Sequence, residues 1–332
     1  MKKGAQITLV VFVIFFVISG LSVGAWFIFR QDRALAAESY LNLGDKYLKD
    51  ENYSQALIAY KKAAILTPRS YAPYLKQGIL AQETKHYQEA IDFINRSITW
   101  GPQELEAYLV LGETYLLNND LANAKASFQQ AKKISPTNDN ISFLLFETAL
   151  LENNLDEAEE NILEAEKDNS LPKYKIYLAL LQSFNDPTES LSLVAKINSA
   201  ADINGLTLSD FSNLFQKLVD VENTTSREVM IYQTFSQLGE IDFGTRGLEK
   251  ITQDNPEMRD GWVMLAYSYL LGSEPDKAKT ALDKAVELDP VYPATYYLLS
   301  KYYEAKGDAK KSEETLTHAQ ELGFDEDSPL KS

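Results

Sequence analysis

The sequence contains no cysteine and only two histidines among its 332 residues. Without cysteine the chain has no disulfide framework, no thiolate metal ligand and no cysteine nucleophile, and two histidines are too few for a polyhistidine metal centre. The G-x-S-x-G, G-x-x-x-x-G-K-[ST] and strand-linked G-x-G-x-x-G motifs of hydrolases and phosphate-binding loops are also missing. These absences predict a protein that is not an enzyme and has no cofactor or metal site.

Basic residues are fewer than acidic ones. The chain has 32 Lys and Arg against 48 Asp and Glu, which gives a formal net charge of −16. Because nucleic-acid binding needs a clustered positive face, nucleic acid is not an expected partner. With 45% hydrophobic and 24% charged residues, the composition is that of a folded protein rather than a disordered acidic one.

Residues 7–29 form an apolar run without a single charge, ITLVVFVIFFVISGLSVGAWFIF. A helix of this length, at about 1.5 Å per residue, crosses a hydrocarbon layer of ~30 Å. The run is longer than the apolar core of a cleavable signal peptide, about 7–15 residues. It therefore predicts a single-pass membrane anchor over residues 1–30. Cleavage at the A-x-A sequence of residues 34–36 is the alternative.

The residues around and within this run bear on orientation and dimerisation. Lys2 and Lys3 precede the run and Arg30 follows it, and we interpret this as a cytoplasmic N-terminus with the body of the protein extracytoplasmic. Gly20 and Gly24 form a GxxxG motif that could bring two such helices together as a dimer. The alternative is that glycine is simply common in membrane helices.

Proline marks an internal period in the rest of the chain. Pro68, Pro102 and Pro136 are 34 residues apart, and Pro256 and Pro290 have the same spacing. A period of this length is typical of helix-turn-helix repeats, in which a proline ends the second helix. The spacing predicts an all-α fold built from stacked helix pairs.

Segment 37–70 shows the pattern within one period. Small residues such as Gly44 and Ala56 are expected where two helices cross at 8–10 Å, and aromatic residues such as Tyr60 and Phe128 are expected to fill the remaining space. The whole pattern resembles the tetratricopeptide repeat. It comprises Tyr40, Leu43, Gly44, Tyr47, Ala56, Tyr60, Ala63 and Pro68.

The resemblance covers nearly all of the chain beyond the anchor. It implies an α-solenoid of about eight helix pairs, similar to membrane-anchored bacterial proteins of this family. Clear copies occupy residues 37–70, 71–104, 105–138, 259–292 and 293–326, and weaker ones residues 139–172, 173–206 and 225–258.

One extra helix is needed to keep the period. The 120 residues between Pro136 and Pro256 are three periods plus 18 residues, enough for one helix with its turn. Apolar residues recur at helical spacing from Leu208 to Val221, and Thr207 with Asp210 could cap the start of this helix. Residues 198–205 are rich in turn-forming residues, so two lobes are predicted to meet there. The predicted parts are the anchor (1–30), a linker (31–36), a first lobe (37–206), the extra helix with a second lobe (207–326) and a tail (327–332).

The resemblance also implies a binding surface. Solenoids present a long concave surface, and in such families it usually binds a peptide or protein segment. Residues on the first helix of each repeat, near the aromatic and glycine positions, are expected to line it. The candidate groove residues are Glu38, Leu41, Asp45, Leu75, Ile79, Glu106, Leu109, Glu113, Phe143 and Glu147.

An aliphatic floor with acidic residues favours a protein or peptide partner that carries apolar and basic side chains. The alternative is that the leucines pack between neighbouring repeats and the acids form a solvated face. We therefore predict a membrane-tethered protein–protein interaction scaffold, with envelope assembly or secretion as processes suggested by analogy alone. The alternative function is a chaperone-like holder of translocating or unfolded client chains.

Overall fold

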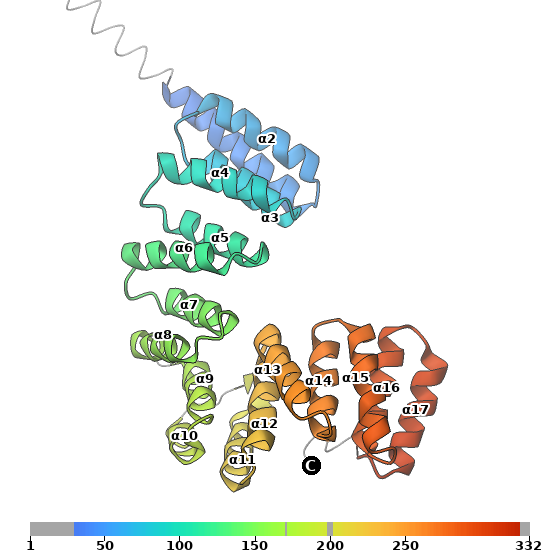
Figure 1. Ribbon diagram of the computed structural model, residues 1–332. Helices are drawn as coiled ribbons and strands as arrows, with labels where there is room; N and C mark the ends of the chain where they lie inside the picture. Colours follow the sequence, from blue (N-terminus) through green and yellow to red (C-terminus); the bar gives the residue numbers. More distant parts are fainter. Residues whose placement is uncertain (1–29, 170, 198–201, 326–332) are drawn as a thin grey trace, which may run out of the picture. The chain divides into compact units, whose positions relative to one another are not determined.

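The computed structural model describes residues 30–169, 171–197 and 202–325 (Figure 1). The predicted membrane anchor, with Gly20 and Gly24, and the predicted tail lie outside this part of the chain. Among the helices of the described residues, none combines the length and the apolar character that a membrane span requires.

The described residues form eight helix pairs and one extra helix, as predicted, and within the pairs from α3 onward each first helix packs against the helix that follows it. The helix over residues 30–49 precedes α2 (Tyr53–Leu66), α3 (Ala72–Glu83), α4 (Tyr87–Trp100), α5 (Leu105–Leu117), α6 (Leu121–Ile134), α7 (Asp139–Leu151), α8 (Leu155–Asp168), α9 (Pro172–Gln182), α10 (Pro187–Val194), α11 (Leu208–Asp220), α12 (Thr224–Leu238), α13 (Ile241–Asp254), α14 (Arg259–Leu271), α15 (Pro275–Leu288), α16 (Pro293–Ala305) and α17 (Ala309–Glu321).

Small residues lie where the helices of a pair cross. A side-chain carbon added to Gly44 would overlap the buried ring of Tyr60, and one added to Gly112 would overlap the buried ring of Phe128. The glycine and the aromatic residue are therefore matched parts of one contact, which confirms their predicted roles.

The turn inside most pairs contains one residue with a left-handed backbone. Such residues recur every 34 positions on both sides of α11, and Asn153 and Gly239 are separated by two periods plus 18 residues. The shift inferred from the prolines is thus present in the backbone. The left-handed residues are Glu51, Lys85, Asn119 and Asn153 before α11, and Gly239, Ser273 and Gly307 after it.

The extra helix is α11, and its start is capped as predicted. The backbone N–H of Asp210 donates to Thr207 Oγ1 at 3.3 Å, and the N–H of Thr207 donates to Asp210 Oδ2 at 2.9 Å. Phe211 and Phe215 on this helix are fully buried. The two-way capping satisfies donors that would otherwise be unpaired at the helix start.

A short hairpin precedes α11 and is an exception to the all-α prediction. β1 (Asp202–Ile203) pairs antiparallel with β2 (Leu206–Thr207). The turn residues Asn204 and Gly205 both have positive φ, 52° and 81°, as the Asn-Gly sequence of a tight hairpin turn favours.

The described residues fall into two compact units, one on each side of the Pro136–Thr137 bond. The second unit has a core cluster that continues from Phe146 on α7 through Phe215 on α11 to Phe243 on α13. The predicted meeting point of two lobes, near residue 206, therefore lies inside the second unit.

Candidate functional site

The candidate groove residues of the first unit differ in exposure. Glu38, Glu106 and Glu113 are exposed, whereas Leu41, Asp45, Ile79 and Leu109 are half-buried. Leu75 is only 2% exposed and belongs to the core cluster that includes Ala107 and Leu111 of the next repeat. Its predicted role in a groove is wrong, because packing between neighbouring repeats leaves it no surface for a partner.

Asp45 links parts of the first unit. Its Oδ1 accepts a hydrogen bond from the Tyr60 hydroxyl at 2.7 Å, and its Oδ2 lies 3.1 Å from Lys76 Nζ. Burial of the Tyr60 hydroxyl and this bond to Asp45 raise the pKa of Tyr60. The candidate groove residue Asp45 thus connects both helices of its own pair to the next repeat.

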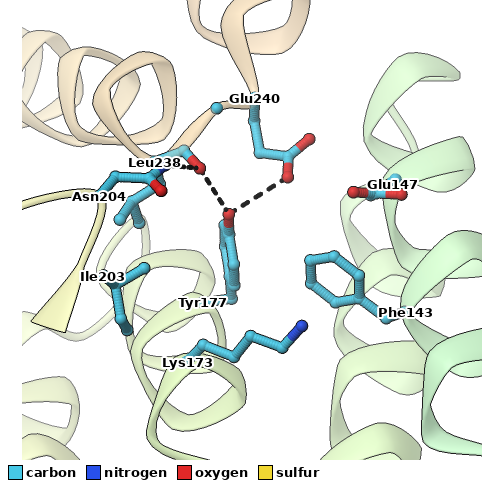
Figure 2. Close-up of a pocket in the computed structure, with 9 residues that line it drawn as sticks. Phe143, Glu147, Lys173, Tyr177, Ile203, Asn204, Leu238 and Glu240 are labelled. Carbon is cyan, nitrogen blue, oxygen red and sulfur yellow. Dashed lines mark hydrogen bonds between the residues drawn. The ribbon is translucent and has the colours of Figure 1, made fainter. Parts of the chain in front are cut away.

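A pocket of about 250 Å³ lies in the second unit, and we call it the Tyr177 pocket (Figure 2). It combines the first helices of two consecutive repeats with two turns that come later in the chain. Its lining comprises Phe143 and Glu147 of α7, Lys173 and Tyr177 of α9, Ile203 and Asn204 of the hairpin, and Leu238, Gly239 and Glu240 between α12 and α13.

Local structure explains why these side chains meet. Phe143 and Glu147 are four residues apart on α7, as are Lys173 and Tyr177 on α9, so each pair shares one face of its helix. Gly239, with a φ of 109°, ends α12 in the left-handed conformation that glycine adopts easily. The chain turns there and brings Glu240 to the pocket.

Hydrogen bonds join the walls of the pocket at the end of α12. The Tyr177 hydroxyl lies 3.1 Å from the carbonyl oxygen of Leu238 and 3.2 Å from Glu240 Oε1, and it can donate to either. Asn204 Nδ2 donates to the same Leu238 carbonyl at 2.8 Å. A helix end, the hairpin and α9 therefore share one small polar cluster, which Figure 2 shows.

The electrostatics of the pocket are dominated by Glu240. Burial, and then the negative charge of Glu147, raise the pKa of Glu240 from an ordinary 4.5 to about 8, against the opposing effects of Tyr177 and Lys173. Burial also raises the pKa of Tyr177, together with the charges of Glu240 and Glu147. Glu240 is thus mostly protonated at neutral pH. A strongly perturbed carboxyl in a concave site is a recognised sign of function.

Aromatic rings form one wall of the pocket. The ring of Phe143 lies 5.5 Å from that of Tyr177, measured between centroids, and 4.3 Å from Lys173 Nζ. A cation at this distance from an aromatic face is attracted by the ring. The wall is therefore apolar but tolerates positive charge at its edge.

A contact between distant helices lies close to the pocket. Arg246 of α13 donates from Nη1 to the carbonyl oxygen of Leu151 at 2.7 Å and from Nη2 to that of Leu150 at 3.3 Å. These carbonyls are at the end of α7, where a positive charge is favourable. The contact holds α13 against α7, and so fixes two of the elements that carry pocket residues.

Sequence reasoning found only part of this site. Phe143 and Glu147 were predicted as surface residues of a first helix, and the structure places them together in the pocket. Lys173, Tyr177 and Glu240 were missed, since they come from other elements. The Asn-Gly hairpin and the Gly-Glu turn were the available local signals. Within the described ranges, no three His, Asp or Glu side chains gather as a metal site would require.

Stacked helix pairs with a 34-residue period place the chain in the class of α-helical repeat proteins. The family description "Tetratricopeptide repeat" matches residues 37–69, 105–138, 260–292 and 293–322. The chain therefore contains tetratricopeptide repeats, as its residue pattern predicted.

Curated relatives and solved structures are similar at low identity. The chain is 22% identical over 280 residues to the BBSome complex member BBS4 homolog of Drosophila melanogaster, which covers 76% of this chain and 58% of that protein. It is 27% identical over 107 residues to anaphase-promoting complex subunit 3 of Schizosaccharomyces pombe, covering 32% and 16%. The chain thus spans less than two thirds of either relative. A tetratricopeptide repeat protein from Parabacteroides merdae has a TM-score of 0.41 at 11% identity, covering 90% and 97%.

Proposed function

We propose that the protein is a protein–protein interaction scaffold that holds a peptide or protein segment against the first helices of its repeats. The observation that carries this proposal is the Tyr177 pocket, because Phe143 and Glu147 were expected on a binding surface and do line a cavity. In the first unit, half-buried Leu109 and exposed Glu113 occupy the corresponding positions on α5.

The repeats and the charge support the proposal. Helical repeats spend their residues on stacking and leave an extended surface free for a ligand. The excess of acidic residues, 48 against 32 basic ones, favours a partner with basic side chains. Both curated relatives are named as members of protein complexes, which is consistent with a role in assembly.

We further propose that residues 7–29 tether the scaffold to a membrane, with the repeats outside the cytoplasm. The support is the uncharged apolar run and the basic residues that precede it. Tethering would raise the effective concentration of a bound partner at the membrane surface. Envelope assembly and secretion are processes in which such a scaffold would act.

Site-specific crosslinking in cells tests the scaffold function. A photoreactive amino acid is placed at Leu109 on the first helix α5 and, as a control, at the exposed Ala126 on the second helix α6. The scaffold predicts one discrete crosslinked partner at Leu109 and none at Ala126. Equal capture at both positions, or none at Leu109, would refute it. Capture of many unrelated chains at Leu109 would instead indicate the chaperone-like holder.

A further inference from the structure

The size of the Tyr177 pocket limits what it can hold. Its volume of about 250 Å³ is below the range of about 300–1,000 Å³ that is usual for drug-sized ligands and cofactors. The space suits a single side chain that enters from a longer segment. One wall is apolar, with the Phe143 ring and Ile203, so it suits the aliphatic part of such a side chain.

The charged groups of the pocket define the head group. Glu147 and Glu240 come from helices far apart in sequence, yet the charge of Glu147 is felt at Glu240. Figure 2 shows both carboxyl groups directed to the region beside the Phe143 ring. When both are ionised, two negative charges and the positive charge of Lys173 leave one negative charge unbalanced. An entering cation would balance it, whereas an anion would be repelled.

We propose that the Tyr177 pocket is a socket for one basic side chain of the partner, a lysine or arginine whose cationic group lies between Glu147 and Glu240. This inference rests on the proposed scaffold function, since the bound segment would carry the side chain. The alkyl part packs against Phe143, and Lys173 stays at the edge of the ring, where its Nζ lies 4.3 Å from the centroid. The socket thus selects a position in the partner rather than a whole sequence.

Binding in this socket is coupled to release of a proton. In the free protein, burial and Glu147 keep Glu240 mostly protonated at neutral pH, while Asp242 on α13 acts in the same direction and Tyr177 and Lys173 on α9 oppose it. A cation beside Glu240 favours its ionised form. Affinity for the cation therefore increases with pH until Glu240 is ionised without a ligand.

The test uses n-butylammonium as the probe and the full chain labelled with [15N]glycine, which gives signals from no more than 15 residues. Gly239 lines the pocket, and Gly307, in the turn between α16 and α17, serves as an internal control. The probe should shift the Gly239 signal saturably, at concentrations up to about 50 mM for so small a ligand, and leave Gly307 unchanged. The neutral analogue 1-butanol should not reproduce the shift.

Two variants separate charge recognition from structure. Glu147→Gln and Glu240→Gln keep the shape of each side chain and should weaken binding of n-butylammonium roughly tenfold or more. Between pH 6 and 8 the affinity of the unmodified chain should increase by up to about tenfold per pH unit, and that of Glu240→Gln should not. Glycine signals outside the pocket report whether each variant is folded.

Three results would overturn the socket. They are no saturable shift at Gly239, an equal shift with 1-butanol, or unchanged affinity in both folded variants. None of them affects the crosslinking outcome at Leu109 in the first unit. The scaffold function and the socket can therefore fail separately.

Discussion

Replacing Glu240 by glutamine should remove most of the pH dependence of the stability of the second unit. In the folded chain the pKa of Glu240 is about 8, and its ordinary value is 4.5. Between these values the folded state binds a proton that the unfolded state has lost. The free energy of unfolding therefore decreases as the pH rises from about 4.5 to about 8 and levels off above that range. The amide of glutamine has no proton to lose, so the variant should lack this decrease.

The size of the effect follows from the same two values. A tenfold difference in acidity corresponds to about 1.4 kcal/mol, so the difference between 4.5 and about 8 sets an upper limit of roughly 5 kcal/mol on the loss. Because the pocket is open to solvent, we expect about half of this limit, roughly 2–3 kcal/mol. At pH 9 the Glu240→Gln variant should be more stable than the unmodified chain by that amount, and near pH 5 the two should be similar.

Tryptophan fluorescence can isolate the second unit. Trp262, on α14, is half-buried and donates from Nε1 to the carbonyl oxygen of Pro256 at 2.8 Å. With Trp26 and Trp100 replaced by phenylalanine, it becomes the single reporter of urea unfolding. The midpoint is measured between pH 5 and pH 9 in the chain with and without Glu240→Gln.

The matched control is Glu222→Gln, which alters an exposed carboxylate in the loop before α12. This variant should follow the unmodified chain at every pH. The reasoning is refuted if the stability of the unmodified chain does not decrease between pH 5 and pH 8, or if Glu240→Gln decreases in parallel with it.

The helix crossings and the turns give two further predictions. Gly112→Leu should destabilise the first unit by about 2–3 kcal/mol, because the new side chain would overlap the buried Phe128 ring. The exposed Ala126→Leu should change the free energy of unfolding by less than about 0.5 kcal/mol in the same urea titration followed by Trp100. Ser273 and Gly307 both have positive φ in equivalent turns, and a side chain at Gly307 would meet no neighbour. Ser273→Gly should therefore stabilise, and Gly307→Ser destabilise, by about 1 kcal/mol each, and equal signs in thermal denaturation would contradict this account.

The repeats could be predicted from the sequence because their signals are local. A proline at each period and a small residue at each crossing predicted the helix pairs, and Thr207 with Asp210 predicted the start of the extra helix. These features depend on residues within about one repeat. The hairpin at Asn204 was harder to predict, because two residues per strand leave no periodic pattern.

The pocket could be predicted only in part because it joins distant segments. Tyr177 and Glu240 are 63 residues apart, and neither carries a local pattern that distinguishes it from other surface positions. Phe143 and Glu147 were found because they share one helix face. Leu75 was assigned to the wrong environment, since the same slot of different repeats can face solvent or a neighbouring helix.

The contact between Arg246 and the end of α7 has a mechanical consequence. In a linear array each hairpin touches only its neighbours, so a pulling force applied to the ends would peel off one hairpin at a time. Here α7 and α13 are bridged across 95 residues, which shields the intervening hairpins from tension. Under load, the stretch from α7 to α13 should rupture in a single large step, while the flanking hairpins extend in small ones.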